Sequence, residues 1–310
     1  MDRVERLEHD LTAQLVATGL AVVGFAFTYT VLTVGSGGGI SGRYAGTSEF
    51  TLWLFLSAAQ TSFWCLVAWP LWQWCRSLLT AIPAGRPRVL AGLSAAAWIV
   101  LIAVPIIAFD QREGIRSPLD AFALRVRLLS AIGLLVAVPA VLGFMALRVT
   151  AQDDSWQHLT QHAAIARYRH ATDRLRGFLA VLGGMVTLAV VVSGARYQAE
   201  NAFNEQFRPD VGTTPTQVLL VLGALLAGVL TLVYLPVRGA LDALGHDLLD
   251  HYCPVPAVAG DDFRPGLERR REFSELLGLG SSARADLESA IVILSPLLGS
   301  LVATFLDTST

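Results

Sequence analysis

The densest group of side chains that could do chemistry lies in the stretch GHDLLDHYC, residues 245–253. If this stretch is helical, it contains two His and Asp pairs, because residues four apart share one face of a helix. Imidazole and carboxylate groups in such an arrangement can bind zinc or another transition metal. The same spacing equally describes two exposed pairs that contribute roughly 0.3 kcal/mol each. The metal hypothesis assigns four ligands: His246, Asp247, Asp250 and His251.

Two further motifs resemble functional signatures but lack the residues or the context that the chemistry requires. His158 and His162 are one helical turn apart, yet HLTQH lacks the glutamate that acts as general base in a zinc protease. The segment GSGGGISG, residues 35–42, has dinucleotide-loop spacing but follows an apolar segment instead of a strand. We therefore assign no catalytic residue and no cofactor, and the metal hypothesis is the one enzymatic alternative.

The elements that would position these residues are indicated by composition. Hydrophobic residues make up 54% of the 310 residues, charged residues only 15%, and the mean hydropathy is +0.54. This is the composition of an all-α polytopic membrane protein. The net charge of -2 and the absence of long runs of like charge argue against a nucleic-acid partner. The lipid bilayer is the expected environment.

Apolar segments of about 20 residues predict membrane-spanning helices. Six are clear: Leu11 to Val34, Phe50 to Trp74, Val89 to Phe109, Leu128 to Leu147, Phe178 to Ala195, and Val218 to Val237. A seventh segment, Ser289 to Leu306, is shorter and is interrupted by Pro296. A proline removes a backbone donor, so this segment is predicted to be either a kinked seventh helix or a broken, re-entrant element.

Tryptophans cluster around the second predicted span, in the stretch FWCLVAWPLWQWCR and shortly before it. An indole can bury its ring and still hydrogen-bond at the membrane surface. We therefore interpret four tryptophans as interfacial anchors, one on one side of the membrane and three on the other: Trp53, Trp69, Trp72 and Trp74.

Most of the 23 arginines fall in the N-terminal segment and the even-numbered connections, which predicts a cytoplasmic N-terminus. No cleavable leader or lipidation motif is evident, so a prokaryotic inner membrane is the simplest location. The predicted domains are a six-helix transmembrane bundle, residues 1–237, a cytoplasmic helical hairpin, 238–288, and a C-terminal membrane segment, 289–310. Within the bundle, residues 149–176 form a cytoplasmic amphipathic segment that is expected to lie at the headgroups.

The six predicted spans contain no Asp, Glu, His or Arg near their centres, which argues against ion-coupled transport. Small residues in the fifth and sixth spans, including Gly183 and Gly223, favour close helix packing. If the last segment lines a pore, its hydroxyls could contact water or ions. The candidate pore or interface residues are Ser295, Pro296, Gly299, Ser300 and Thr304.

Three hypotheses about function follow. The first is a homo-oligomeric channel or pore for ions or small solutes, because a compact helical membrane protein without a catalytic site is suited to conducting solutes or to assembling with other subunits. The second is a membrane-embedded scaffold or sensor that acts through a protein partner at its cytoplasmic loops. The third is a metal-dependent membrane enzyme.

Overall fold

The computed structural model describes residues 3–34, 38–82, 85, 88–97, 99–100, 117–119, 121–215, 217–254, 263–279 and 283–307. Within these residues the chain is 91% helical and contains no strand, which confirms the all-α prediction. The helices are α1 (Arg3–Thr33), α2 (Gly39–Ala45), α3 (Ser48–Ala81), α5 (Phe122–Ala151), α6 (Gln161–Phe207), α7 (Gln217–Tyr252), α8 (Phe263–Leu277) and α9 (Ala283–Asp307). Two 3₁₀ turns, η1 (Asp154–His158) and η2 (Pro209–Val211), precede and follow α6.

Five helices are long and apolar enough to cross a membrane: α1, α3, α5, α6 and α7. They contain five of the six predicted spans. About half of the third predicted span, Val89 to Phe109, lies outside the described residues, and the segment Arg88–Ala97 is an apolar helix. The last segment belongs to α9, which continues through Pro296 as one helix, so of the two alternatives the broken element does not describe it.

Two helices are much longer than a membrane is thick. α6 has 47 residues and α7 has 36, which correspond to roughly 70 and 54 Å at the helical rise, against about 30 Å of hydrocarbon. The amphipathic segment predicted at 149–176 is divided in the structure between the end of α5, the turn η1 and the first turns of α6. Likewise, α7 continues across the predicted domain boundary at residues 237 and 238.

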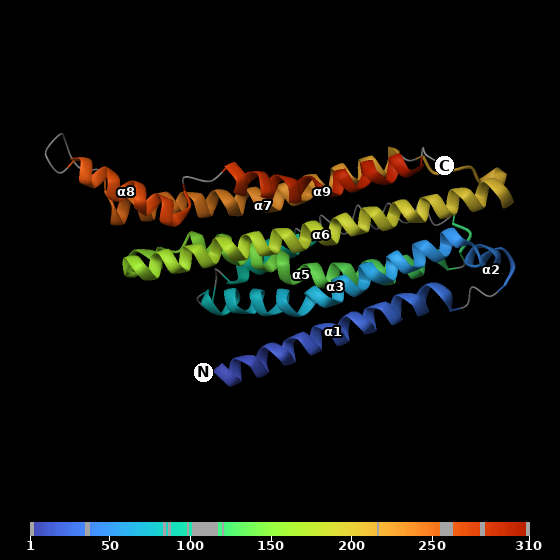
Figure 1. Ribbon diagram of the computed structural model, residues 1–310, viewed down its shortest axis with the longest axis horizontal. Helices are drawn as coiled ribbons and strands as arrows, with labels where there is room; N and C mark the ends of the chain where they lie inside the picture. The colour runs from blue at the N-terminus through green and yellow to red at the C-terminus, as the bar shows by residue number, and fades with distance from the viewer. Residues whose placement is uncertain are drawn as a thin grey trace.

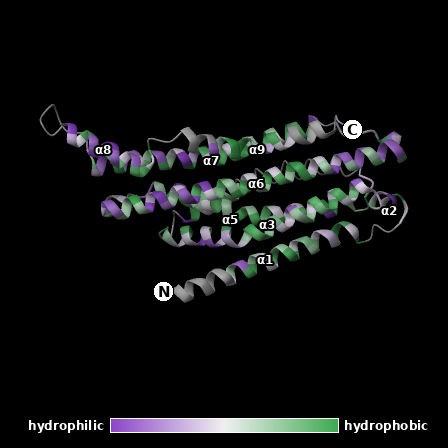
Figure 2. Cartoon of the chain, in the orientation of Figure 1, coloured by the Kyte–Doolittle hydropathy of each residue, from purple (hydrophilic) through white to green (hydrophobic). Residues whose placement is uncertain are grey.

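The helices lie side by side in an elongated bundle, and the first residues of α1 and the last of α9 are at opposite ends (Figure 1). We call these the N end and the C end. At the N end, α6, α7 and α8 extend past the first turns of α1 (Figure 1). We call this projection, residues 161–176, 238–254 and 263–277, the helical extension. Figure 2 shows hydrophilic residues throughout the extension and hydrophobic residues concentrated in the middle of the bundle.

One buried core connects the bundle with the extension. It begins with Trp64 on α3, continues through Phe178 on α6, and reaches Phe273 and Leu277 on α8. A second apolar cluster at the C end contains Tyr44 on α2 together with residues of α3, α5 and α6. Because α6 and α7 are shared by the bundle and the extension, a displacement of either helix affects both parts.

Close approach between helices depends on small residues, as the sequence predicted. A Cβ atom added at Gly183 would lie 2.4 Å from Cγ1 of Val292 on α9. A Cβ atom at Gly223 would lie 2.8 Å from Oγ of Ser300. Both distances are far below van der Waals contact, so only glycine lets α9 pack this closely against α6 and α7.

Candidate functional site

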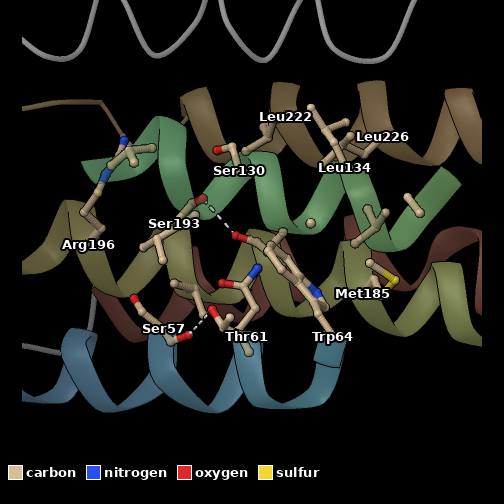
Figure 3. Close-up of a pocket in the computed structure, with 18 of the residues that line it drawn as sticks. Ser57, Thr61, Trp64, Ser130, Leu134, Met185, Ser193, Arg196, Leu222 and Leu226 are labelled. Carbon is tan, nitrogen blue, oxygen red and sulfur yellow. Dashed lines mark hydrogen bonds between the residues drawn. The ribbon is translucent and has the colours of Figure 1, made fainter. Parts of the chain in front are cut away.

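A cavity of about 290 Å³ lies between α3, α5, α6 and α7. Figure 3 shows Ser57, Thr61 and Trp64 projecting from α3 toward Ser130 and Leu134 of α5, with α6 and α7 completing the walls. The walls are mainly apolar and carry a few polar groups, which is the usual make-up of a site for a small molecule. The sequence did not predict this cavity, because its walls come from four helices far apart in the chain.

The polar groups on the cavity wall differ in whether they have a hydrogen-bond partner within the protein. The Thr61 hydroxyl donates to the Ser57 carbonyl, and the Ser193 hydroxyl donates to the Ala189 carbonyl, so both are bonded within their own helix. In contrast, the Gln60 carboxamide makes no hydrogen bond to any described residue, although the residue is only 7% exposed. The polar atoms of this amide are not fully enclosed by protein, so Gln60 presents an unbonded donor and an unbonded acceptor to the cavity.

Trp64 is the second polar group without a partner. Its indole nitrogen Nε1 is buried and makes no hydrogen bond to the described residues. The indole ring lies against Gly133 of α5, where an added Cβ would be 2.6 Å from Cζ3. This close approach fixes the ring, so the tryptophan keeps its position on the cavity wall beside the Gln60 turn of α3.

At its C end the cavity is bounded by Arg196 of α6. Nε of Arg196 lies 3.9 Å from Oε1 of Glu200, one turn further along the same helix, and both side chains are almost fully buried. The guanidinium also lies over the rings of Phe122 and Tyr197. The positive charge is therefore compensated by a carboxylate and two aromatic faces, which makes its burial tolerable.

The C end contains further polar contacts that tie loops to the bundle. Arg125 of α5 donates to the Leu32 carbonyl of α1, and Asn201 of α6 both donates to and accepts from the backbone of Thr214. Burial, and secondly the negative charge of Glu200, raise the pKa of Tyr44 well above its usual value. The hydrogen bonds at this end therefore join α1 to α5 and the segment at Thr214 to α6.

The helical extension is held together by specific contacts. The Tyr252 hydroxyl at the end of α7 donates to the Leu159 carbonyl just before α6. Arg270 of α8 donates to the Cys253 carbonyl and forms an ion pair with Asp250 of α7. With Phe273 buried beneath them, these contacts dock α8 on α7.

The four predicted metal ligands all lie on the last turns of α7. Nδ1 of His246 lies 2.8 Å from the Asp242 carbonyl, and Asp250 pairs with Arg270. Asp247 and His251, with Asp250, border a second, polar cavity of about 370 Å³ beside η1. No group of three or more His, Cys, Asp or Glu in the described part of the chain is placed to hold a metal ion.

The candidate pore residues of α9 face neighbouring helices of the same chain. The Ser295 hydroxyl contacts the Thr187 hydroxyl of α6, and Gly299 lies against Thr187 and Val191. Pro296 and Ser300 are buried against α7 near Gly223, while the side chain of Thr304 is outside the described part. Packing within the chain thus accounts for their small size, and the channel function stays a prediction.

The four predicted anchors differ in environment. Trp53 is 3% exposed and packs against Phe50, so its ring contacts protein. Trp74 packs on Phe178 of α6, and Trp69 is partly buried. Trp72 is 51% exposed and is the one of the four with an open ring surface. Of the four, the structure therefore supports an outward-facing anchor best at Trp72.

Comparison with known proteins adds no relative: no protein-family model, curated protein or solved structure matches this chain. The features of the molecule that bear on function are the cavity, the extension and the two long helices that join them.

Proposed function

We propose that this protein is a membrane-embedded sensor, in which occupation of the cavity is transmitted through α6 and α7 to the helical extension. The single observation that carries this proposal is the course of α6. It contributes Met185, Ser193 and Arg196 to the cavity wall and also forms one side of the extension. A continuous helix is stiff, so a shift at the cavity is expected to reach the extension.

The membrane location is part of the proposal and rests on the outer surface of the bundle. Side chains that point away from the core are apolar along the middle of several helices, for example Leu15, Val22, Leu135 and Val221, each more than 60% exposed. Such a surface is stable in lipid and unfavourable in water. The mixed charged surface of the extension suits the aqueous side, where a protein partner would read its state.

The distribution of packing also supports a sensor. The parts of α6 and α7 that lie nearest the N end, together with α8, share one buried core with the bundle. The extension is therefore not an independently folded appendage. A contiguous packed element of this kind can carry coupling between two sites when it has more than one arrangement. The cavity supplies the place at which a ligand can favour one arrangement.

The test fills the cavity by mutation and monitors the extension. Leu134→Trp introduces bulk at the cavity wall, while Leu135→Trp places the same bulk at a neighbouring position that is 70% exposed. In the full-length protein in lipid nanodiscs, we expect Leu134→Trp to change hydrogen exchange in residues 241–254 and 263–277 by about fivefold or more, the lower range of coupling energies. Leu135→Trp should leave it unchanged.

The outcome that contradicts the proposal is equally definite. If Leu134→Trp remains folded by circular dichroism and changes exchange only next to residue 134, the cavity is not coupled to the extension. The sensor function would then be excluded for this cavity.

A further inference from the structure

The chemistry of the cavity wall identifies a class of ligand. We propose that the cavity binds a neutral, mostly apolar molecule that carries one hydroxyl or carbonyl oxygen, with the Gln60 carboxamide holding that oxygen. This inference builds on the proposed sensor function by naming its ligand class.

The size and apolar character of the cavity define the body of the ligand. A volume of about 290 Å³ corresponds to roughly ten water volumes of ~30 Å³ and lies at the lower end of the range for small-molecule sites. Leu134 of α5 and Leu222 and Leu226 of α7 form much of the wall (Figure 3). Apolar walls favour an apolar occupant over water, which needs several polar partners.

The position of Gln60 defines where the polar oxygen of the ligand binds. Its carboxamide is buried on the cavity wall with neither its donor nor its acceptor side bonded to a described residue. The Trp64 indole nitrogen, one turn along α3, is a second unbonded donor. A hydroxyl can both donate to and accept from a carboxamide, whereas a carbonyl can accept from it, so either oxygen can hydrogen-bond to the unpaired amide.

The electrostatics of the site exclude a charged ligand. Among the described residues of the cavity wall, Arg196 is the one that is charged, and it is paired with Glu200 and covered by two aromatic rings. An additional buried charge would therefore lack a counter-charge and would be strongly disfavoured. The ligand must be neutral.

The route of entry follows from two residues of α7. Val221 and Leu225 line the cavity and are also 66% and 41% exposed, so the cavity opens toward the apolar outer surface of the bundle. A neutral ligand dissolved in the bilayer can enter there without crossing water.

The experiment uses photoaffinity labelling of the full-length protein in nanodiscs. The probe is a diazirine-bearing medium-chain alcohol, and the matched probe is the carboxylic acid of the same chain length. We expect the alcohol to label residues on the cavity wall and the acid to label them weakly. Gln60→Leu should weaken alcohol labelling about fivefold, as expected for one lost hydrogen bond. The control Gln73→Leu, further along α3 and away from the cavity, should retain the alcohol labelling of the wild type.

Three results would overturn the inference, and the first two are equal alcohol labelling of Gln60→Leu and wild type and equally strong labelling by the acid. Absence of cavity labelling by the alcohol would likewise overturn it and would indicate a water-filled cavity. The sensor proposal is tested separately, because its measurement is hydrogen exchange in the extension of the Leu134→Trp variant and involves no probe.

Discussion

The hydroxyl oxygens of Thr187 on α6 and Ser295 on α9 lie 2.6 Å apart, joining two helices whose sequences are separated by more than a hundred residues. Each hydroxyl is also within bonding distance of a carbonyl of its own helix, Gly183 for Thr187 and Val292 for Ser295. Because a hydroxyl has one hydrogen, one of the two donates across the interface and the other donates to its own helix. This contact is the polar centre of the interface between α6 and α9.

A double-mutant cycle measures this contact. Thr187→Val and Ser295→Ala should each destabilise the protein, and the coupling between them should be about 0.6 kcal/mol, the average for hydrogen bonds between membrane helices. The measurement is the free energy of unfolding in detergent. Purely additive effects would mean that the two hydroxyls do not interact.

A pair of glycines tests the packing of α9. Gly183→Ala places a Cβ against both a side-chain and a backbone atom of Val292, at 2.4 and 3.1 Å, so we expect destabilisation of about 1–3 kcal/mol. Gly228→Ala adds its Cβ where no atom lies within 4 Å and should be neutral or slightly stabilising. Thermal unfolding of the two variants provides the comparison, and equal melting temperatures would contradict the arrangement of α9.

Neighbouring arginines test the docking of α8. Arg270 is largely buried and donates to the Cys253 carbonyl, whereas Arg271 is exposed and pairs only with Glu275 of its own helix. We expect Arg270→Ala to lower the local stability of α8 by about 1–2 kcal/mol, and Arg271→Ala to have little effect. Hydrogen exchange of residues 263–277 measures both, and similar exchange in the two variants would show that α8 is held by other contacts.

Tyr44 should make the stability of the C end dependent on alkaline pH. Burial, and then the charge of Glu200, raise the pKa of this phenol in the folded protein above its unfolded value of about 10. The neutral phenol therefore contributes its full stabilisation below pH ~10. This stabilisation is lost as the pH rises from there toward the pKa in the folded protein, by up to about 1.4 kcal/mol per pH unit. Tyr44→Phe should remove this dependence in unfolding experiments, while Tyr29→Phe, at an exposed position, should preserve it.

The ends of the chain test the topology. The first residues of α1 and the last residues of α9 lie at opposite ends of the bundle. If the bundle spans a membrane with the N-terminus in the cytoplasm, a reporter fused after Thr310 should be active only when it requires the outside compartment. Activity of a reporter that functions only in the cytoplasm would contradict the predicted orientation.

Hydropathy alone was sufficient to predict the helical class and the approximate positions of five long apolar helices. A charge-free stretch of about 20 residues is a local property of the sequence, and such a stretch is long enough to form a helix that spans a membrane. The small residues Gly183 and Gly223 were also predicted as packing sites, because a missing side chain has one evident consequence between helices.

The tertiary structure decided where the functional features lie. The walls of the cavity, from Gln60 on α3 to Leu226 on α7, meet only after the helices associate, so no periodicity of one segment reveals them. The four donors at 246–251 suggested a metal site through their spacing alone, but Asp250 is engaged by Arg270, twenty residues away. Similarly, α6 and α7 continue beyond their apolar segments, because the buried core reaches polar sequence that hydropathy assigns to loops. Local sequence determines which segments become helices, whereas long-range packing determines which of their side chains share a site.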